Sequence, residues 1–265
     1  MSIKIFVLTV NGSLRRPALI NEVDCDVNIF SSSKEVDFQS QDLLINQKAN
    51  LIILGRELSV NEKRTLLSHA SVIKKTTHDW SIVLEDDAIV DKALFANFLS
   101  IINNLHINKP TIFLLYIGKN GVFVRKKSDI VRNSLISFHR CLALPSGAVS
   151  YAINSSAADI LGNCVTYTGT ADWPTWSINI SFFGIFPQIV NHDFSVESIA
   201  QVDAIDSAGI LWPAERYRVA KMFLGLMKPR QIMAYGGFLG YLELNVLAGL
   251  YRRICKFFPS LFFRT

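Results

Sequence analysis

A short apolar segment that ends in three consecutive acids most constrains the fold of this chain. Residues 81–84 (Ser-Ile-Val-Leu) have the length and composition of a buried strand, and Glu85, Asp86 and Asp87 follow directly. Adjacent carboxylates repel one another, and a hard divalent cation with oxygen ligands would relieve that repulsion. The alternative is a solvated acidic turn. The apolar segment in front of the acids favours a metal site.

Segments of strand and helix length alternate along most of the chain. Strands are expected at residues 3–10, 26–31, 51–54, 80–84, 111–116 and 149–153, and helices at 41–47, 59–76, 91–104 and from 155 onward. The clearest helix start is Ser59 with Glu62, which fits a capping box. The alternation predicts an α/β fold with a largely parallel sheet and helices on both faces. Ligands of such sheets bind at the carboxyl ends of strands, where the three acids lie.

Charge divides the chain near residue 213. The net charge is +5 over 265 residues, but residues 213–265 hold nine Lys or Arg and two acids, a local charge of +7. The first 212 residues therefore carry −2. We predict a globular domain over 1–212 and a basic, apolar, helical C-terminal extension over 213–265. The basic residues stand among apolar ones and no nucleic-acid-binding module is recognised, so no nucleic-acid partner is expected.

The C-terminal extension has the character of a membrane-contacting segment. Residues 231–251 are long enough to cross a bilayer, but Glu243 lies within them, and a charge near mid-span costs ~2.5 to 3.5 kcal/mol on insertion scales. Residues 251–264 interleave cations with aromatic rings, which suits an anionic membrane surface. Packing on the domain and an oligomer contact are the alternatives. With no secretory signal recognised, we expect a cytoplasmic protein held peripherally at the inner face of the cytoplasmic membrane.

The chain lacks both familiar glycine-rich phosphate loops. A bound nucleotide would need its diphosphate neutralised in another way. Mg²⁺ and Mn²⁺ are commonly held by one or two carboxylates together with substrate phosphate oxygens. The acidic strand end fits that role.

Residues 58–69 and 81–88 together resemble glycosyltransferase family 25, which includes bacterial lipooligosaccharide galactosyltransferases and collagen galactosyltransferases. The resemblance rests on a helix that carries Glu62, Ser68 and His69, followed by a strand that ends in Glu-Asp-Asp. Weaker similarity in residues 10–16, 147–161 and 170–173 extends it over residues 1 to about 200. The usual Asn-Leu pair of the family's first strand is not preserved here.

The resemblance implies a GT-A-like domain that transfers a hexose, with galactose expected, from a UDP-sugar to a bacterial surface glycan of the lipooligosaccharide, lipopolysaccharide or capsule type. It implies inversion of configuration and a divalent metal, Mn²⁺ or Mg²⁺. The implied metal ligands are Glu85, Asp87 and His192. The implied donor-binding residues are Asn11, Arg15, Arg16, Glu62, Ser68, His69 and Asp86. The alternative is a non-catalytic glycan- or membrane-associated assembly protein on the same fold.

Three of these assignments have structural alternatives. Asp172 is the predicted catalytic base because it matches the later family acid and stands near Trp173 and Trp176, but it could instead cap a following helix. His69 either faces the donor together with Glu62 or is a satisfied core histidine. His192 is either a metal ligand, by analogy with other GT-A enzymes, or a buried structural residue.

Overall fold

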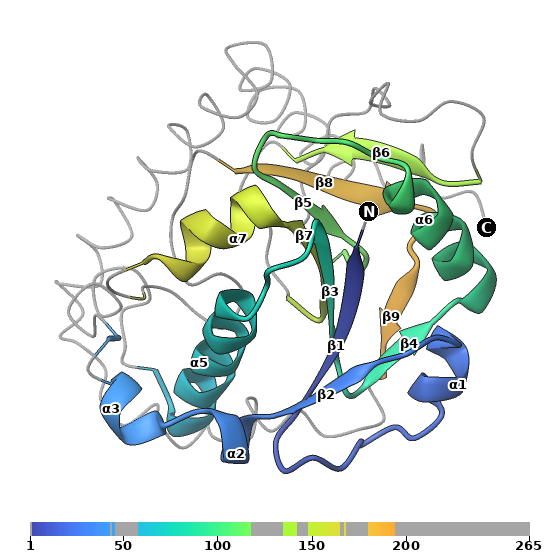
Figure 1. Ribbon diagram of the computed structural model, residues 1–265. Coiled ribbons are helices and arrows are strands. Elements are labelled where there is room, and N and C mark those ends of the chain that lie inside the picture. The colour runs from blue at the N-terminus through green and yellow to red at the C-terminus, as the bar shows by residue number, and fades with distance from the viewer. Residues whose placement is uncertain are drawn as a thin grey trace, which may run out of the picture.

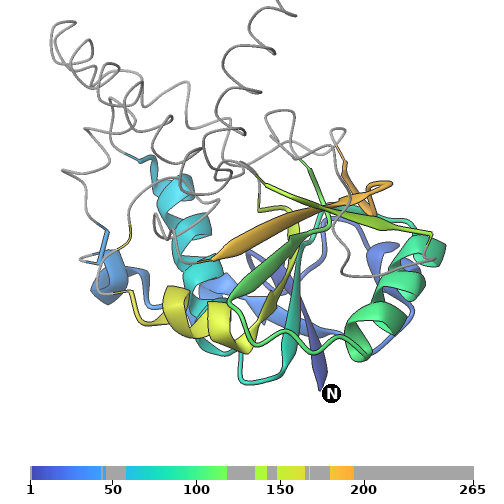
Figure 2. The same ribbon diagram turned by 90° about the horizontal axis from the view of Figure 1, so that it is seen from above.

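A seven-stranded sheet forms the centre of the fold, with helices on both of its faces (Figure 1). The view from above also shows helices on either side of the sheet (Figure 2). The computed structural model describes residues 2–42, 44–45, 58–117, 135–141, 148–164, 167 and 180–193. The predicted C-terminal extension and the predicted strand at 51–54 lie outside these residues.

The large sheet has the strand order β2-β1-β3-β7-β5-β8-β6. Its strands are β1 (Ile3–Thr9), β2 (Asn28–Ser31), β3 (Trp80–Glu85), β5 (Thr111–Leu114), β6 (Ser137–Arg140), β7 (Ser150–Asn154) and β8 (Ser181–Phe186). A separate two-stranded sheet pairs β4 (Ala88–Val90) with β9 (Val190–His192). The helices are α1 (Leu19–Val23), α2 (Ser32–Glu35), α3 (Phe38–Asp42), α5 (Val60–Lys74), α6 (Lys92–Asn103) and α7 (Ser155–Gly162).

Most strands of the large sheet run in one direction. β1 is parallel to both β2 and β3, and β5 is parallel to β8, whereas β7 is antiparallel to its neighbours β3 and β5. β6 is antiparallel to β8. The described strands therefore form a mixed sheet that is mostly parallel, and this fits a GT-A-like domain. The reversal of β7 between β3 and β5 is not apparent from its sequence.

Alternate residues along the central strands enter two separate cores. In β3, Val83 packs into the core beneath α5 and α7, while Ile82 and Leu84 pack into the core beneath α1 and α6. Tyr151 of β7 shares the first core, and Ala152 shares the second. This alternation is what a strand buried on both faces requires, because successive side chains point in opposite directions.

Helix α5 begins as its sequence predicts. The Ser59 hydroxyl accepts a hydrogen bond from the backbone N–H of Glu62, and the Glu62 carboxylate accepts one from the backbone N–H of Ser59. The capping box thus satisfies two backbone donors that the first turn would leave unpaired. It also fixes where the helix starts, and hence which side chains face the sheet.

The helix predicted at 41–47 is wrong in position. The structure has α3 at Phe38–Asp42, and Ile45 lies in an isolated bridge with Tyr167. The Asp37 carboxylate explains the earlier start, because it accepts hydrogen bonds from the backbone N–H groups of Gln39 and Ser40. Helices α1 and α2 and strands β4, β6, β8 and β9 were not predicted at all.

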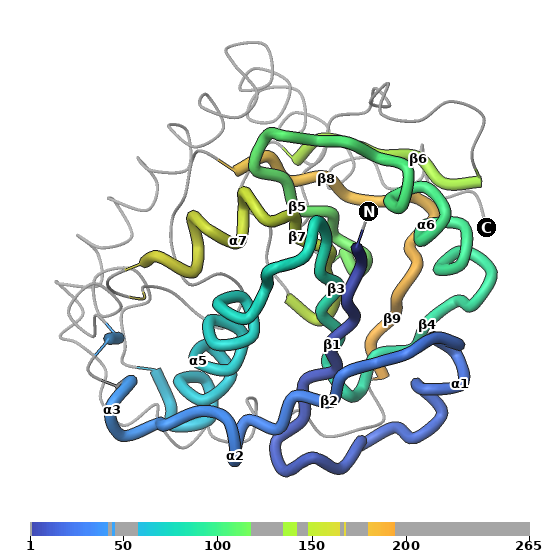
Figure 3. Tube along the Cα trace, in the orientation of Figure 1, coloured from blue at the N-terminus to red at the C-terminus, as the bar shows by residue number. Residues whose placement is uncertain are grey.

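Two strands of the small sheet bring distant parts of the chain together. The backbone trace shows the chain leaving β3 and turning into β4, which lies beside β9 (Figure 3). Their register places Ala88 opposite His192 and Val90 opposite Val190.

Within the described part of the chain, no helix combines the length and the apolar character that a membrane crossing needs.

Asn154 joins three elements through one buried side chain. It ends β7 and caps α7: its Oδ1 accepts from the backbone N–H of Ala157 (3.0 Å) and of Thr111 (2.9 Å). Its Nδ2 donates to the carbonyls of Ile107 (3.0 Å) and Lys109 (2.8 Å). The side chain therefore ties β7 and α7 to the segment that enters β5.

We expect Asn154→Ala to lower the free energy of unfolding by about 2 to 4 kcal/mol, because a helix cap is lost and buried backbone groups lose their partners. Urea denaturation monitored by circular dichroism measures this. The control is Asn163→Ala at the exposed end of the same helix, which should change the value by less than about 0.5 kcal/mol. Equal losses in the two variants would contradict the proposed role of Asn154.

Candidate functional site

The candidate site begins where β3 leaves the sheet. Glu85 is the last residue of β3, and its backbone N–H donates to the carbonyl of Val149 (2.8 Å). Asp86 and Asp87 follow in the turn to β4 and are 3% and 1% exposed. The acidic triplet is therefore mostly buried, and the solvated-turn alternative does not hold. Buried carboxylates need opposite charges or hydrogen-bond donors around them.

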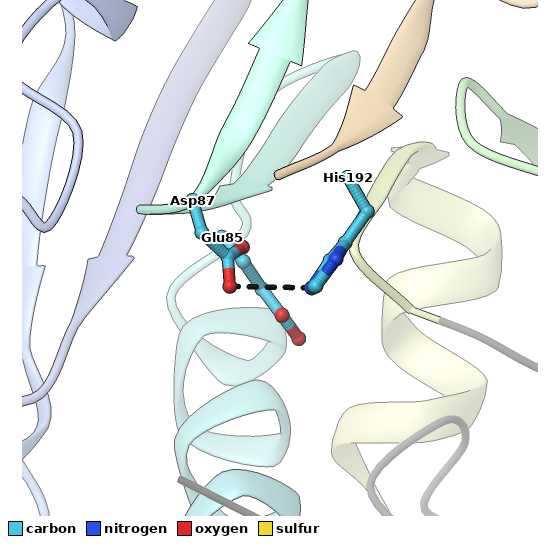
Figure 4. A group of neighbouring side chains, drawn as sticks. All are labelled: Glu85, Asp87 and His192. Atoms are coloured by element: carbon cyan, nitrogen blue, oxygen red, sulfur yellow. Dashed lines mark ion pairs between the residues drawn. The ribbon is translucent and has the colours of Figure 1, made fainter. Parts of the chain in front are cut away.

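Glu85, Asp87 and His192 converge at this strand end (Figure 4). Each offers one possible metal-ligand atom, and these atoms all lie within 4.8 Å of one another. His192 Nε2 is 3.3 Å from Asp87 Oδ2. The β4–β9 pairing brings His192 there, and the backbone N–H of Asp193 donates to the carbonyl of Asp87 (3.1 Å). The structure thus gathers the three predicted metal ligands.

The second carboxylate oxygen of Asp87, Oδ1, is the clearest indication of a ligand-binding site in this cluster. Asp87 Oδ1 is buried and has no hydrogen-bond partner among the described residues. A buried carboxylate oxygen without a partner is unfavourable unless a ligand satisfies it. Two carboxylates and one imidazole form a donor set suited to a divalent cation such as Mn²⁺. The residues present therefore fit a metal ion.

Arg15 supplies positive charge from the other side. Its Nε donates to Asp86 Oδ1 (2.6 Å), and its Nη2 lies 2.9 Å from Asp87 Oδ2. Even so, burial raises the pKa of Asp86, and burial together with the charge of Glu85 raises the pKa of Asp87. For Asp86 and Asp87, the charge of Arg15 does not offset burial, so further positive charge would stabilise their ionised forms.

Arg16 has a different set of partners from its neighbour. Its guanidinium pairs with Glu22 of α1 and donates to the carbonyl of Ala88 (3.0 Å), while its Nε is 4.0 Å from Asp193 Oδ2. Glu22 in turn accepts from the backbone N–H of Val90 (2.9 Å). The pair of Arg16 and Glu22 therefore holds the small sheet that positions His192.

His69 of α5 contacts the acidic strand end from within the core. It is 1% exposed, and its Nε2 lies 3.2 Å from Glu85 Oε1. Its Nδ1 lies 3.2 Å from the Tyr151 hydroxyl. For Glu85, burial opposes ionisation, but the hydrogen bond from His69 and the positive charge of Arg15 prevail and lower its pKa.

The other predicted donor-binding residues lie in several places. Glu62 completes the α5 capping box, and the Ser68 hydroxyl donates to the carbonyl of Arg64 one turn earlier (2.6 Å). Asn11 is exposed after β1, where its Oδ1 accepts from the backbone N–H of Ser13 (3.0 Å). The predicted base Asp172 lies outside the described residues.

Sequence reasoning missed two residues that contact the site. Tyr151 reaches it through His69, and the Tyr116 ring lies 6.3 Å, centroid to centroid, from that of His192. Both stand in or directly after apolar strands, where an aromatic residue is the expected core residue. A signal was present for Tyr151, because its hydroxyl needs a partner when buried. The sequence does not identify that partner.

A mixed α/β fold with a mostly parallel central sheet fits a GT-A-like domain. The family model Glycosyltransferase family 25 (LPS biosynthesis protein) matches residues 2–168, and the chain belongs to this family. It is therefore a glycosyltransferase of the lipopolysaccharide-biosynthesis type, and such an enzyme acts with a sugar donor and a glycan acceptor. None of the curated proteins compared with the chain matches it.

The Arg16–Glu22 pair gives a pH-dependent prediction. The hydrogen bond from Arg16 lowers the pKa of Glu22, so this pair stabilises the fold when Glu22 is ionised. The stabilisation is complete above the ordinary Glu pKa of about 4.3 and is lost as the pH falls through the lowered value. We expect Glu22→Gln to lower the free energy of unfolding by about 1 kcal/mol at pH 7, since the pair is partly exposed.

Urea denaturation at several pH values measures this, and the difference from wild type should shrink below about pH 4. The control is Asp24→Asn, which removes the charge of an exposed pair with Lys92 and should have little effect. A loss for Glu22→Gln that does not depend on pH would contradict the prediction.

Proposed function

We propose that this protein is a metal-dependent, inverting hexosyltransferase that moves galactose from UDP-galactose to a bacterial surface glycan of the lipooligosaccharide, lipopolysaccharide or capsule type. The observation that carries the proposal is the cluster of Glu85, Asp87 and His192 with the unpartnered Asp87 Oδ1. Family membership supports sugar transfer, and the donor set of this cluster supports the metal.

In this proposal, Glu85, Asp87 and His192 hold Mn²⁺ or Mg²⁺ against the donor diphosphate. The bound ion would supply Lewis-acid stabilisation of the charge that develops on the leaving UDP. Such a counter-ion is needed because the chain has no glycine-rich phosphate loop. Arg15 holds the Asp86 carboxylate and contacts Asp87, so it orients the acidic turn before any ligand arrives.

The remaining steps fall to side chains around the cluster. Inversion requires the acceptor hydroxyl to attack the anomeric carbon directly while a carboxylate takes its proton. Asp172 is the proposed base. Asn11, exposed at the carboxyl end of β1, is a proposed donor contact, because ligands of α/β sheets collect at such strand ends. Arg16 and His69 support the site through Glu22 and Glu85.

The decisive variant is Asp87→Asn, which keeps the shape of the side chain and removes its charge. We expect loss of Mn²⁺ binding in calorimetric titration and a fall of about 100-fold or more in transfer or hydrolysis of UDP-galactose, because Lewis-acid stabilisation is worth several kcal/mol. The metal-free melting temperature should not fall, since burial and the charge of Glu85 disfavour the ionised form of Asp87 in the folded protein.

The matched control is Asp159→Asn on the exposed face of α7, which should bind Mn²⁺ and turn over UDP-galactose like wild type. Unchanged Mn²⁺ binding and turnover in Asp87→Asn would overturn the enzymatic proposal. Metal-dependent binding of UDP-galactose without hydrolysis or transfer to any glycan would instead favour the non-catalytic assembly protein.

We also propose that the C-terminal extension attaches the enzyme peripherally to the inner face of the cytoplasmic membrane, near a lipid-linked acceptor. Cations among aromatic residues in 251–264 support this. The full chain should float with phosphatidylglycerol vesicles at low salt, and changing Arg252, Arg253 and Lys256 to Gln should reduce flotation several-fold.

A second triple variant controls for net charge. It changes the exposed Lys34, Lys92 and Lys109 to Gln, which removes three positive charges from the domain and leaves the extension intact. This variant should float as well as wild type. Equal flotation of both triple variants would contradict membrane attachment through the extension.

A further inference from the structure

Three side chains from three elements are linked by two successive hydrogen bonds, and the last of the three belongs to the acidic cluster. The Tyr151 hydroxyl of β7 lies 3.2 Å from His69 Nδ1, and His69 Nε2 lies 3.2 Å from Glu85 Oε1 at the end of β3. Tyr151 and His69 are 0% and 1% exposed. Solvent therefore does not compete for the contact between Tyr151 and His69, while the Glu85 side chain is 22% exposed at the end of the series.

The strand register explains why the three groups meet. Tyr151 pairs with Val83, and both point into the core beneath α5. Glu85 stands two residues after Val83 in the same strand, so its side chain lies on the same face. His69 projects from α5 into this face, and its ring lies 5.8 Å, centroid to centroid, from that of Tyr151. The position of His69 between the other two thus follows from the sheet.

The chemistry of the three groups determines which of them donates each hydrogen bond. A neutral imidazole has one N–H donor and one acceptor nitrogen. An ionised carboxylate only accepts hydrogen bonds, so Glu85 places the proton of a neutral His69 on Nε2. Nδ1 is then an acceptor, and the Tyr151 hydroxyl can donate to it. The hydroxyl of Tyr151 in this way holds the imidazole ring whose Nε2–H contacts Glu85.

We propose that Tyr151 is a positioning residue that orients Glu85 for metal binding by holding the imidazole ring of His69, whose Nε2–H donates to the Glu85 carboxylate. This inference rests on the proposed function, because it takes Glu85 as a metal ligand. A carboxylate that is already held by one oxygen loses less freedom when it binds an ion, and such supporting partners typically contribute 10- to 100-fold in metal affinity. Tyr151 and His69 would contact neither substrate nor metal.

The first test uses Mn²⁺ alone as the probe, in calorimetric titration of the full chain. Tyr151→Phe removes the hydroxyl and keeps the ring, and we expect it to weaken Mn²⁺ binding about tenfold. The matched control is Tyr167→Phe, because Tyr167 is equally buried, lies in the same core and packs beneath Lys74 rather than His69. It should leave Mn²⁺ affinity within about twofold of wild type.

A double-mutant cycle separates orientation from general loosening of the core. In His69→Gln, an amide N–H replaces Nε2–H, and no imidazole nitrogen remains for the Tyr151 hydroxyl to hold. Tyr151→Phe should therefore cause no further loss of Mn²⁺ affinity in the His69→Gln background. The same tenfold loss in both backgrounds would overturn the proposal.

Nitrogen-15 NMR of the metal-free wild-type protein tests the tautomer without any variant. The expected result is His69 with its proton on Nε2 at neutral pH, and a proton on Nδ1 would overturn the inference. The two proposals fail differently. Absence of Mn²⁺ binding by wild type would overturn both, whereas wild-type binding that Tyr151→Phe leaves unchanged would overturn this inference alone.

Discussion

Burial of negative charge at the end of β3 is the constraint on which the rest of the site depends. Glu85, Asp86 and Asp87 are mostly shielded from water, and each is met by a basic side chain from elsewhere in the chain. These are Arg15 after β1, His69 in α5 and His192 in β9. The elements around the sheet thus bring these three basic groups to one strand end, where they lie against the buried acids.

Local signals in the sequence were sufficient for the elements that begin or end sharply. The apolar run before Glu85 predicted β3, and the Ser59 and Glu62 pair predicted the start of α5. Strand direction was not predictable in the same way. Residues 150–154 of β7 are buried on both faces, so their composition is that of a parallel strand although β7 is antiparallel. The short strands β4 and β9 carry too few residues for a periodic pattern.

The site was predictable in its membership more than in its arrangement. Arg15 and Arg16 had the same expected role, yet Arg15 turns to Asp86 and Arg16 turns to Glu22. Sequence adjacency does not determine which way two neighbouring loop side chains point. His69 was expected either to face a donor or to be a core histidine, and the structure buries it between Glu85 and Tyr151. Such long-range partners depend on strand register, and register is a property of the whole sheet.

The pairing of β4 with β9 also determines when the site can exist. Asp87 stands directly before β4, whereas His192 ends β9, close to the last described residues of the chain. A nascent chain would present its acidic strand end long before the histidine emerges from the ribosome. The acids therefore meet His192 only after about a hundred further residues have been synthesised, as is typical of folds with long-range contacts. Completion of the cluster therefore requires that the long-range pairing of β4 with β9 has formed.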